Sequence, residues 1–350
     1  MRIVSAASAF PKHYYPQHVL VDAFRKHWGG KLDNPRMLEW LHERVGVEGR
    51  YLAQPKEKYE ALSGFGEAND LWIEAAQELG EKAICCALSR AGLAREDLAA
   101  IIFVSVTGIA SPSIDARLIN RMGLSPNIRR VPIFGLGCVA GAAGIARAAD
   151  YVRAYPNQAA VLVAVEICSL TIQRDDLSIA NLISSGLFGD GAAAVIVAGS
   201  ELEGPPGPTI VATRSIFYPD TEDVMGWTIS EKGFRIVLSP GVPDMVRDHL
   251  AQDVDAFLAE NELARGDIGT WIIHTGGPKV LEATQESLAL PDGALDVSWE
   301  CLRKTGNLSS ASVLCVLEKF MTERRPSPGT WSVLAAMGPG FCSELVLLRW

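Results

Sequence analysis

A stretch of the chain that begins at Leu93 recurs 170 residues later, beginning at Leu263. Residues 93–104 read Leu-Ala-Arg-Glu-Asp-Leu-Ala-Ala-Ile-Ile-Phe-Val, and residues 263–274 read Leu-Ala-Arg-Gly-Asp-Ile-Gly-Thr-Trp-Ile-Ile-His. The same offset carries the strand-like run 160–165 onto another, 330–335. A constant spacing between matching elements is the sign of an internal repeat. The sequence therefore predicts two similar halves in one chain.

The apolar runs predict the kind of sheet that each half contains. Residues 160–165 and 192–197 consist only of alanine, valine, isoleucine and leucine. Strands without polar alternation are typical of sheets that helices cover on both faces. The glycine- and proline-rich residues 199–208 predict a link between the halves. The sequence predicts an α/β protein of duplicated α-β-α-β-α layers, with residues 1–200 as the first half and 201–350 as the second.

Composition and charge exclude several classes of partner. The chain has 350 residues, 48% of them hydrophobic, which is enough to bury a large core. Its formal net charge is −9 and it has no basic run, which argues against nucleic acid and against an anionic membrane surface. No apolar stretch approaches the roughly 18 residues of a membrane span, and no signal segment is visible. We expect a cytoplasmic protein without stable membrane insertion.

Cysteine usage predicts reduced thiols. The seven cysteines are odd in number, lie mostly in apolar stretches and show no pair at the two-residue spacing of zinc sites. We expect neither a metal site nor a cofactor.

Cys138 stands out from the other cysteines by its neighbours. It lies in residues 134–144, Phe-Gly-Leu-Gly-Cys-Val-Ala-Gly-Ala-Ala-Gly, where small residues allow a sharp bend followed by a helix. A thiol in the first turn of a helix lies at the positive end of the peptide dipoles, which favours the nucleophilic thiolate. Cys138 is therefore a candidate nucleophile, with a small buried core cysteine as the alternative.

His274 and Asn307 lie where α/β proteins form their sites. His274 ends an apolar run and precedes Thr-Gly-Gly, so its imidazole is expected at the carboxyl end of a buried strand. Asn307 lies in a loop before a helical pattern, and the 170-residue offset carries Cys138 to the position beside it. If a pseudo-twofold axis relates the halves, the three side chains meet at the junction. The alternatives are a structural histidine and a helix-capping asparagine.

Five motifs, taken in order, resemble the type III polyketide synthases, the chalcone synthase-like family on the thiolase fold. The resemblance covers nearly the whole chain, and it implies an acyltransferase that forms a homodimer. The motifs are Gly137 to Gly141, Leu187 to Ala193, the strand ending at His274, Gly306 to Ala311, and Gly338-Pro339-Gly340.

The resemblance implies that Cys138, His274 and Asn307 are the catalytic residues. Cys138 takes an acyl group from a starter acyl-CoA. His274 and Asn307 donate hydrogen bonds to the thioester carbonyl of malonyl-CoA, so that loss of carbon dioxide leaves a stabilised enolate. The enolate attacks the acyl-cysteine, and the cycle repeats before the product cyclises. The expected ligands are the CoA thioesters acyl-CoA and malonyl-CoA.

The resemblance also implies a set of substrate-binding residues. Ile236 stands where an aromatic residue is usual in the family, and Cys168 stands where plant members carry threonine. Both differences favour a bacterial member that accepts a fatty acyl-CoA and forms an alkylpyrone or alkylresorcinol, although both residues can also be ordinary core residues. Arg44 and Arg50 are expected near the tunnel mouth for coenzyme A, with a solvated helix-end charge as the alternative for either one. The full set is Thr107, Cys168, Thr171, Phe188, Ile236, Ser309, Gly338, Pro339, Gly340 and Arg50.

Two other functions stay open at this point. A ketosynthase that initiates fatty-acid synthesis, like β-ketoacyl synthase III, shares the Cys, His and Asn set but condenses only once. A non-catalytic acyl-binding protein of the same fold would bury Cys138 without using it. In the expected dimer, Ser111 replaces the methionine that plant members place in the neighbour's cavity.

Overall fold

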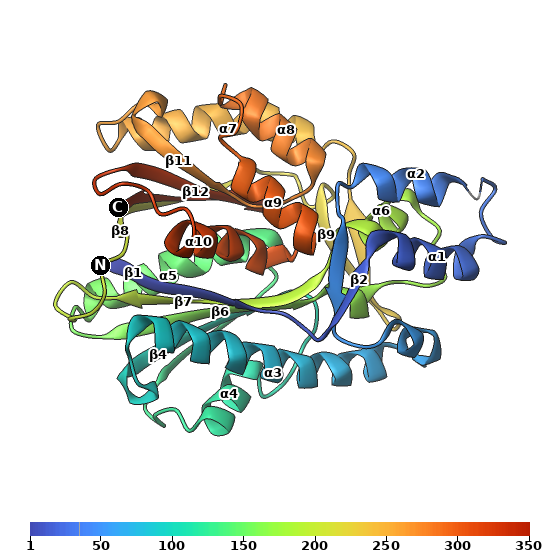
Figure 1. The fold of residues 1–350 in the computed structure, drawn as a ribbon, viewed down its shortest axis with the longest axis horizontal. Helices are drawn as coiled ribbons and strands as arrows, with labels where there is room; N and C mark the ends of the chain where they lie inside the picture. The colour runs from blue at the N-terminus through green and yellow to red at the C-terminus, as the bar shows by residue number, and fades with distance from the viewer. Residues whose placement is uncertain (35) are drawn as a thin grey trace.

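The computed structural model describes residues 1–34 and 36–350. Within them, the strands form one long mixed sheet and two small two-stranded sheets (Figure 1). The order in the long sheet is β11-β12-β13-β8-β1-β7-β6-β4-β5. In this order the strands span Ile268–Ile273, Trp331–Gly338, Cys342–Arg349, Thr209–Phe217, Arg2–Ala9, Asp190–Ala198, Ala159–Ile167, Leu98–Ser105 and Arg129–Phe134.

The long sheet is built from two sheets that meet at one residue pair. β1 and β8 pair only through Arg2 and Thr209, whereas the other neighbours pair along most of their length. In one sheet β4 is parallel to β6, and β7 is antiparallel to both β6 and β1. In the other, β11 is parallel to β12, and β13 is antiparallel to both β12 and β8. The predicted duplication is therefore confirmed as a repeat of strand order and direction.

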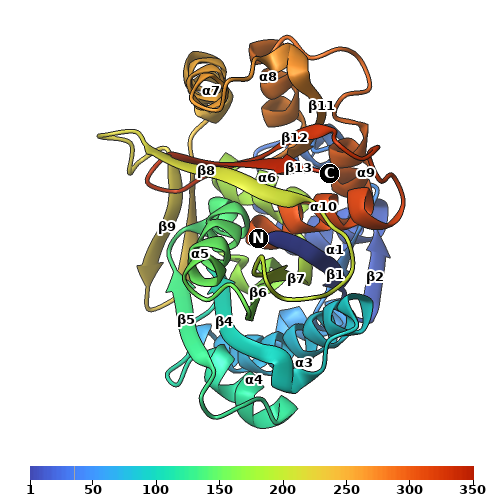
Figure 2. The same cartoon turned by 90° about the vertical axis from the view of Figure 1, so that its left-hand side faces the viewer.

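Two helices form the central layer between the sheets (Figure 2). α5 (Ala140–Ala154) and α10 (Ser312–Thr322) fill one core together with the inner faces of both sheets. They approach closely because Gly141 has no side chain, and a Cβ there would overlap the carbonyl oxygen of Ser310. The small residues around Cys138 thus serve the packing of α5 against α10.

Four further helices cover the outer faces. α3 (Phe65–Ala91) and α4 (Ile114–Met122) pack on the first sheet, and α7 (Val242–Ala259) and α8 (Pro278–Ser287) pack on the second (Figure 1). The predicted thiolase-like α-β-α-β-α layering is confirmed. Among the described helices, none combines the length and the apolar character needed to cross a membrane.

Several elements outside these layers gather at one end of the molecule (Figure 1). The repeat does not predict them, because each occurs in one half only. Four of the seven contribute residues to the lining of the cavity described below. They are β2 (His13–Pro16), α1 (Gln17–Trp28), α2 (Arg36–Arg44), β3 (Gly49–Leu52), α6 (Ile179–Leu187), β9 (Met225–Ser230) and β10 (Gly233–Leu238).

The two halves share contacts beyond the linker. Residues 199–208 connect β7 to β8, but β1 also pairs with β8, and α10 of the second half packs on β1 of the first. The division into residues 1–200 and 201–350 as separate domains stays a prediction.

Candidate active site

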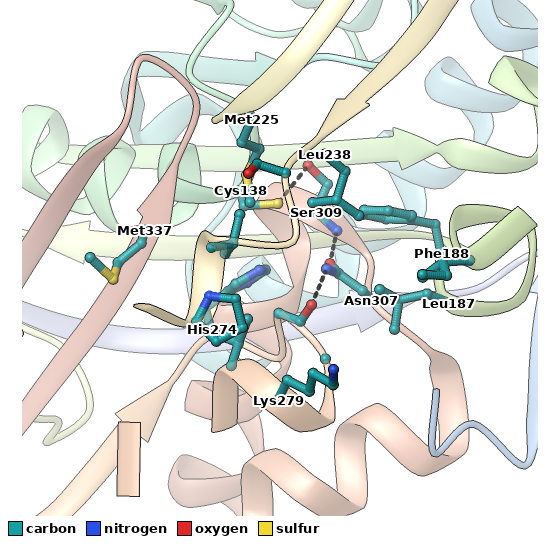
Figure 3. Close-up of a pocket in the computed structure, with 18 of the residues that line it drawn as sticks. Cys138, Leu187, Phe188, Met225, Leu238, His274, Lys279, Asn307, Ser309 and Met337 are labelled. Carbon is teal, nitrogen blue, oxygen red and sulfur yellow. Dashed lines mark hydrogen bonds between the residues drawn. The ribbon is translucent and has the colours of Figure 1, made fainter. Parts of the chain in front are cut away.

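Cys138 lies in a single helical turn, Gly137–Val139, that leads directly into α5. The turn begins at Gly137 with φ of +53°, a left-handed conformation that favours glycine. The Cys138 side chain is buried, and its Sγ lies 3.8 Å from the hydroxyl oxygen of Ser309 (Figure 3). The sharp bend predicted from the glycines therefore presents the thiol to the start of α10.

His274 directly follows β11, as the sequence predicts. Its backbone N–H donates to the carbonyl oxygen of Ala335 on β12 at 3.0 Å, which holds the residue at the sheet edge. The imidazole is buried, and among the described residues neither ring nitrogen has a hydrogen-bond partner. Burial lowers the pKa of His274 to about 4, so the ring is neutral at pH 7. Both nitrogens are thus available to a ligand.

Asn307 is held by backbone contacts with the end of α6. Its N–H donates to the carbonyl of Leu187 at 2.9 Å, and its carbonyl accepts from the N–H of Gly189 at 3.0 Å. The side-chain oxygen accepts from the Ser309 N–H at 2.8 Å, and the side-chain nitrogen donates to the Gly276 carbonyl at 3.4 Å. Because the oxygen is turned toward the backbone, the amide nitrogen is the atom available to a ligand (Figure 3).

Cys138 is a neutral thiol in this structure, whereas its place at a helix start predicted a thiolate. Burial raises its pKa to about 12, and the buried Glu166 adds to this, although hydrogen bonds from Ser309 and Asn307 act in the opposite direction. The desolvation cost of the thiolate therefore outweighs its stabilisation by the peptide dipoles at the helix start. In the free protein both the thiol and the imidazole of His274 are neutral.

Cys138, His274 and Asn307 line one cavity of about 630 Å³. The structure thus brings together the three residues that the sequence placed on separate elements. The cavity reaches solvent, because several of its lining residues are exposed, among them Trp40 on α2 at 52% and Ile179 on α6 at 58%.

Six of the ten predicted substrate-binding residues line this cavity. They are Thr107, Cys168, Phe188, Ile236, Ser309 and Pro339. Thr171 lines a much smaller adjoining cavity, which shares Cys168, Phe188 and Ile236 with the main one.

Gly338 and Gly340 are not part of the cavity lining. A Cβ at Gly338 would lie 2.8 Å from both the Leu136 carbonyl oxygen and the Val139 nitrogen. Gly338 therefore allows β12 to pack directly against the turn that carries Cys138. In this structure its contribution to the site is the position of the thiol, and a substrate contact at Gly338 or Gly340 stays a prediction.

The prediction of Arg50 as a coenzyme A contact does not fit its place in the structure. The side chain is only 1% exposed, and its Nη1 donates to the carbonyl oxygen of Phe188 at 2.6 Å, behind the cavity wall. Its aliphatic part lies against Gly306, next to Asn307. Burial lowers the pKa of Arg50 to about 10, with nearby Asp190 opposing the shift. Arg50 supports the wall and is out of reach of a phosphate at the cavity opening.

Arg44, which the sequence placed near the tunnel mouth, lines the cavity, whereas sequence reasoning missed the cation Lys279 and one aromatic side chain. Arg44 lies over the Trp40 ring at 4.4 Å, and both Arg44 and Lys279 line the cavity. Trp227 on β9 is the cross-strand partner of Ile236 on β10 and also lines the cavity. Trp227 therefore provides, on the neighbouring strand, the aromatic ring that position 236 lacks. The sequence could not show this, because it does not reveal which residues of the two strands are paired.

Glu166 was also missed as part of the site. Its carboxylate is fully buried at the end of β6 and accepts hydrogen bonds from the Thr107 hydroxyl at 2.9 Å and the Val106 N–H at 3.1 Å. The Ser310 N–H at the start of α10 donates to its other oxygen at 3.4 Å. Burial raises the pKa of Glu166. It links the floor of the cavity to α10. Its neighbours in the sequence, Val165 and Ile167, are apolar, and they were the only local sign of its burial.

Comparison with known proteins gives a consistent result along the chain. Residues 2–201 match the family model "Chalcone and stilbene synthases, N-terminal domain", and residues 209–350 match the corresponding C-terminal domain. A 1,3,6,8-tetrahydroxynaphthalene synthase from Streptomyces peucetius is 50% identical over 99% of this chain and 93% of its own length. A phloroglucinol synthase from Pseudomonas fluorescens is 31% identical over 97% of each chain.

Solved structures agree with the sequence relatives. The crystal structure of 1,3,6,8-tetrahydroxynaphthalene synthase from Streptomyces coelicolor, described as a bacterial type III polyketide synthase, superposes with a TM-score of 0.95. The two proteins are 33% identical, and the match covers 100% of this chain and 99% of that one.

Proposed function

Since the chain belongs to the chalcone and stilbene synthase family of type III polyketide synthases, we propose that Cys138 carries an acyl chain that malonyl-CoA extends. Enzymes of this family are acyltransferases that catalyse decarboxylative condensation with malonyl-CoA. We assign these roles because Cys138, His274 and Asn307 line the same cavity.

Loading exchanges one thioester for another. The Cys138 sulfur bonds to the acyl carbonyl carbon, the bond from that carbon to the CoA sulfur breaks, and the thiol proton passes through His274 to the departing sulfur. The buried thiol needs this base because its pKa is raised to about 12. The neutral imidazole can accept the proton because both ring nitrogens lack partners among the described residues.

Extension uses His274 and Asn307 as hydrogen-bond donors. They hold the thioester oxygen of malonyl-CoA while the bond to its carboxylate carbon breaks, so that carbon dioxide leaves and the electron pair forms an enolate. The enolate carbon attacks the acyl carbon on Cys138, and the sulfur leaves as thiolate. The product is a CoA thioester two carbons longer. The lost carboxylate supplies the electron pair, so the step requires no cofactor.

Two classes of product follow from different observations. The relative that is 50% identical is named for 1,3,6,8-tetrahydroxynaphthalene, a fused aromatic polyketide, and an aromatic product made from malonyl-CoA alone is our first candidate. The second candidate is an alkylpyrone or alkylresorcinol made from a fatty acyl-CoA. The apolar side chains around Ile236 and Leu238 in the cavity favour it.

Coenzyme A is proposed to bind at the cavity opening. Its phosphates need cations, and Arg44 and Lys279 line the opening of a chain whose net charge is −9. Arg44 keeps its expected role, and Lys279 takes the place of Arg50.

The partner is proposed to be a second copy of the chain. Within the described residues, β5 pairs only with β4, which leaves its other edge free. Val131 and Phe134 on this strand are 39% and 49% exposed. An exposed apolar strand edge is a ready surface for pairing with another strand. A cytoplasmic location stays a prediction.

A starter screen tests the function. Purified protein is incubated with malonyl-CoA alone and with acyl-CoAs from acetyl to octadecanoyl, and the products are identified by mass spectrometry. Products with repeated two-carbon additions support the proposal. A single addition found only on a carrier protein would instead indicate an initiating ketosynthase, and the absence of any acyl-Cys138 would indicate an acyl-binding protein.

The substitution Asn307→Ala separates the two chemical steps. Loss of one donor to a developing oxyanion typically costs about two to three powers of ten in rate. Release of carbon dioxide from malonyl-CoA should fall by that factor, whereas acylation of Cys138, measured by intact mass, should persist. Ser312→Ala, which removes a 3.3 Å hydrogen bond to the Asn307 side-chain oxygen, is the control and should lose less. Equal loss of both steps in Asn307→Ala would contradict the assigned role.

A further inference from the structure

The backbone of Asn307 is paired with residues 187–189, which lead from the end of α6 to β7 (Figure 3). Its N–H donates to the Leu187 carbonyl at 2.9 Å, and its carbonyl accepts from the Gly189 N–H at 3.0 Å. Phe188, between these two residues, forms a bridge of parallel type with Asn307. The position of Asn307 therefore depends on where this short segment lies.

Arg50 on β3 contacts the chain on both sides of this pairing. Its Nη1 donates to the Phe188 carbonyl oxygen at 2.6 Å, between the two residues that bond to Asn307. A Cβ at Gly306, the residue before Asn307, would lie 3.2 Å from the Arg50 Cδ. Gly306 also has φ of +72°, a conformation that favours glycine. One side chain thus supports both the residue before Asn307 and the segment paired with it.

Asp190, at the start of β7, ties the same segment to β3 a second time. Its Oδ2 accepts from the N–H of Ala53, directly after β3, at 2.7 Å, and its Oδ1 accepts from the Ser169 N–H at 2.8 Å. Burial raises the pKa of Asp190 to about 6 and lowers that of Arg50 to about 10, so both groups are charged at pH 7. Arg50 and Asp190 therefore hold β3 to the end of α6 and to the start of β7.

Enolate formation is the proposed step that depends most on where Asn307 lies. A donor to a developing oxyanion is effective because the protein fixes its position before the reaction. A misplacement of about 1 Å can cost about a hundredfold in rate. Acylation of Cys138 is proposed to use His274, so it depends less on the Asn307 amide.

We propose that Arg50 is a positioning residue, which holds Gly306 and Phe188 and through them fixes the Asn307 amide for enolate formation. The inference rests on the proposed function and deepens it, because it adds to one chemical step a residue that does not line the cavity.

The test compares Arg50→Met with His42→Leu. Arg50→Met keeps an unbranched side chain but removes the donor to Phe188. His42 is the matched control, because it is also 1% exposed and its Nε2 lies 3.1 Å from the carbonyl oxygen of Leu182, in the same helix α6. That carbonyl keeps the Ser185 hydroxyl as a donor at 2.8 Å. Release of carbon dioxide from malonyl-CoA is measured for each protein, and so is acylation by the best starter of the screen.

In Arg50→Met, kcat for release of carbon dioxide should fall about tenfold to a hundredfold. KM for malonyl-CoA should change by less than about threefold, because the donor acts mainly in the transition state. Acylation of Cys138 should also stay within about threefold, and His42→Leu should keep both rates within about twofold. An equal loss of both steps in Arg50→Met, or the same selective loss in His42→Leu, would overturn the inference.

A double-mutant cycle shows whether Arg50 acts through Asn307. In the Asn307→Ala protein, the further change Arg50→Met should slow release of carbon dioxide by less than about twofold, because the donor is already absent. Losses that multiply in full would contradict the inference.

Arg50→Lys keeps the charge and a single donor group, and it takes the place of Arg50→Met in the cycle if that variant does not fold. It should show a smaller selective loss and the same lack of additivity, and equal losses of both steps would overturn the inference. If the unmodified protein releases no carbon dioxide from malonyl-CoA, the proposed function fails. Normal release by both the unmodified protein and the Arg50 variant would overturn the inference alone.

Discussion

Burial controls the protonation of the individual site residues. The His274 ring and the Cys138 thiol are each neutral at pH 7, because burial lowers the pKa of the first to about 4 and raises that of the second to about 12. A neutral imidazole suits both of its proposed tasks, since it can accept the thiol proton and can donate to an enolate oxygen. The same burial has a consequence for stability.

We predict a pH-dependent contribution of His274 to the free energy of unfolding. The unfolded histidine has a pKa near 6.5 and binds a proton more readily than the folded one, so acid favours the unfolded chain. The contribution is complete above pH 6.5 and is lost as the pH falls toward 4. Between pH 7.5 and 5 the wild type should lose about 2 kcal/mol more than His274→Asn, as measured by urea unfolding at both values. Parallel losses in the two proteins would contradict the burial of a neutral ring.

The positions of some site residues could be predicted from the sequence, and those of others could not. Cys138, His274 and Asn307 lie at turns and strand ends, which are local patterns, and their meeting followed from the repeat. Arg50 could not be placed in this way, because its burial depends on a carbonyl 138 residues away in the chain. A charged residue in a short strand is read as exposed unless its distant partner is known.

At the scale of elements, the contact between α5 and α10 determines where the site lies. Both helices begin at the cavity, one after Cys138 and the other after Asn307 and Ser309. The strands and the outer helices could be predicted from apolar runs and the repeat. The hairpin of β9 and β10 could not, because its residues show only half-buried or exposed side chains for most of its length. Trp227 was therefore missed.

We predict that Gly141→Ala destabilises the protein. The added Cβ would overlap the Ser310 carbonyl oxygen, so the two central helices must move apart, at a cost of about 1–3 kcal/mol. The control is Gly66→Ala in the first turn of α3, where a Cβ meets no atom within 4 Å. This control should be neutral or slightly stabilising, since alanine favours helix. Equal midpoints of urea unfolding for the two variants would show that the helices are not in close contact.

At the scale of the whole molecule, the resemblance and the physical argument led to the same five layers. The choice of starter could not be decided in this way, because it depends on the shape of a cavity to which both halves contribute.

We predict that the free edge of β5 forms the dimer. Val131→Lys places a charge on this edge and should convert a dimer into a monomer in light scattering after size-exclusion chromatography. Val211→Lys on β8 is the matched control, because Val211 is 38% exposed and Val131 is 39% exposed. The control should keep the mass of the unmodified protein. If Val131→Lys remains a dimer, the interface does not lie at the β5 edge, and the prediction is wrong.

The equivalent positions of Cys138 and Asn307 also bear on the origin of the molecule. Two identical units, paired about a symmetry axis, would carry the same side chain at both helix starts. A nucleophile on one side and an amide on the other require two different genetic positions. Joining the units in one polypeptide supplies them, so the duplicated chain can carry different chemistry at its two helix starts.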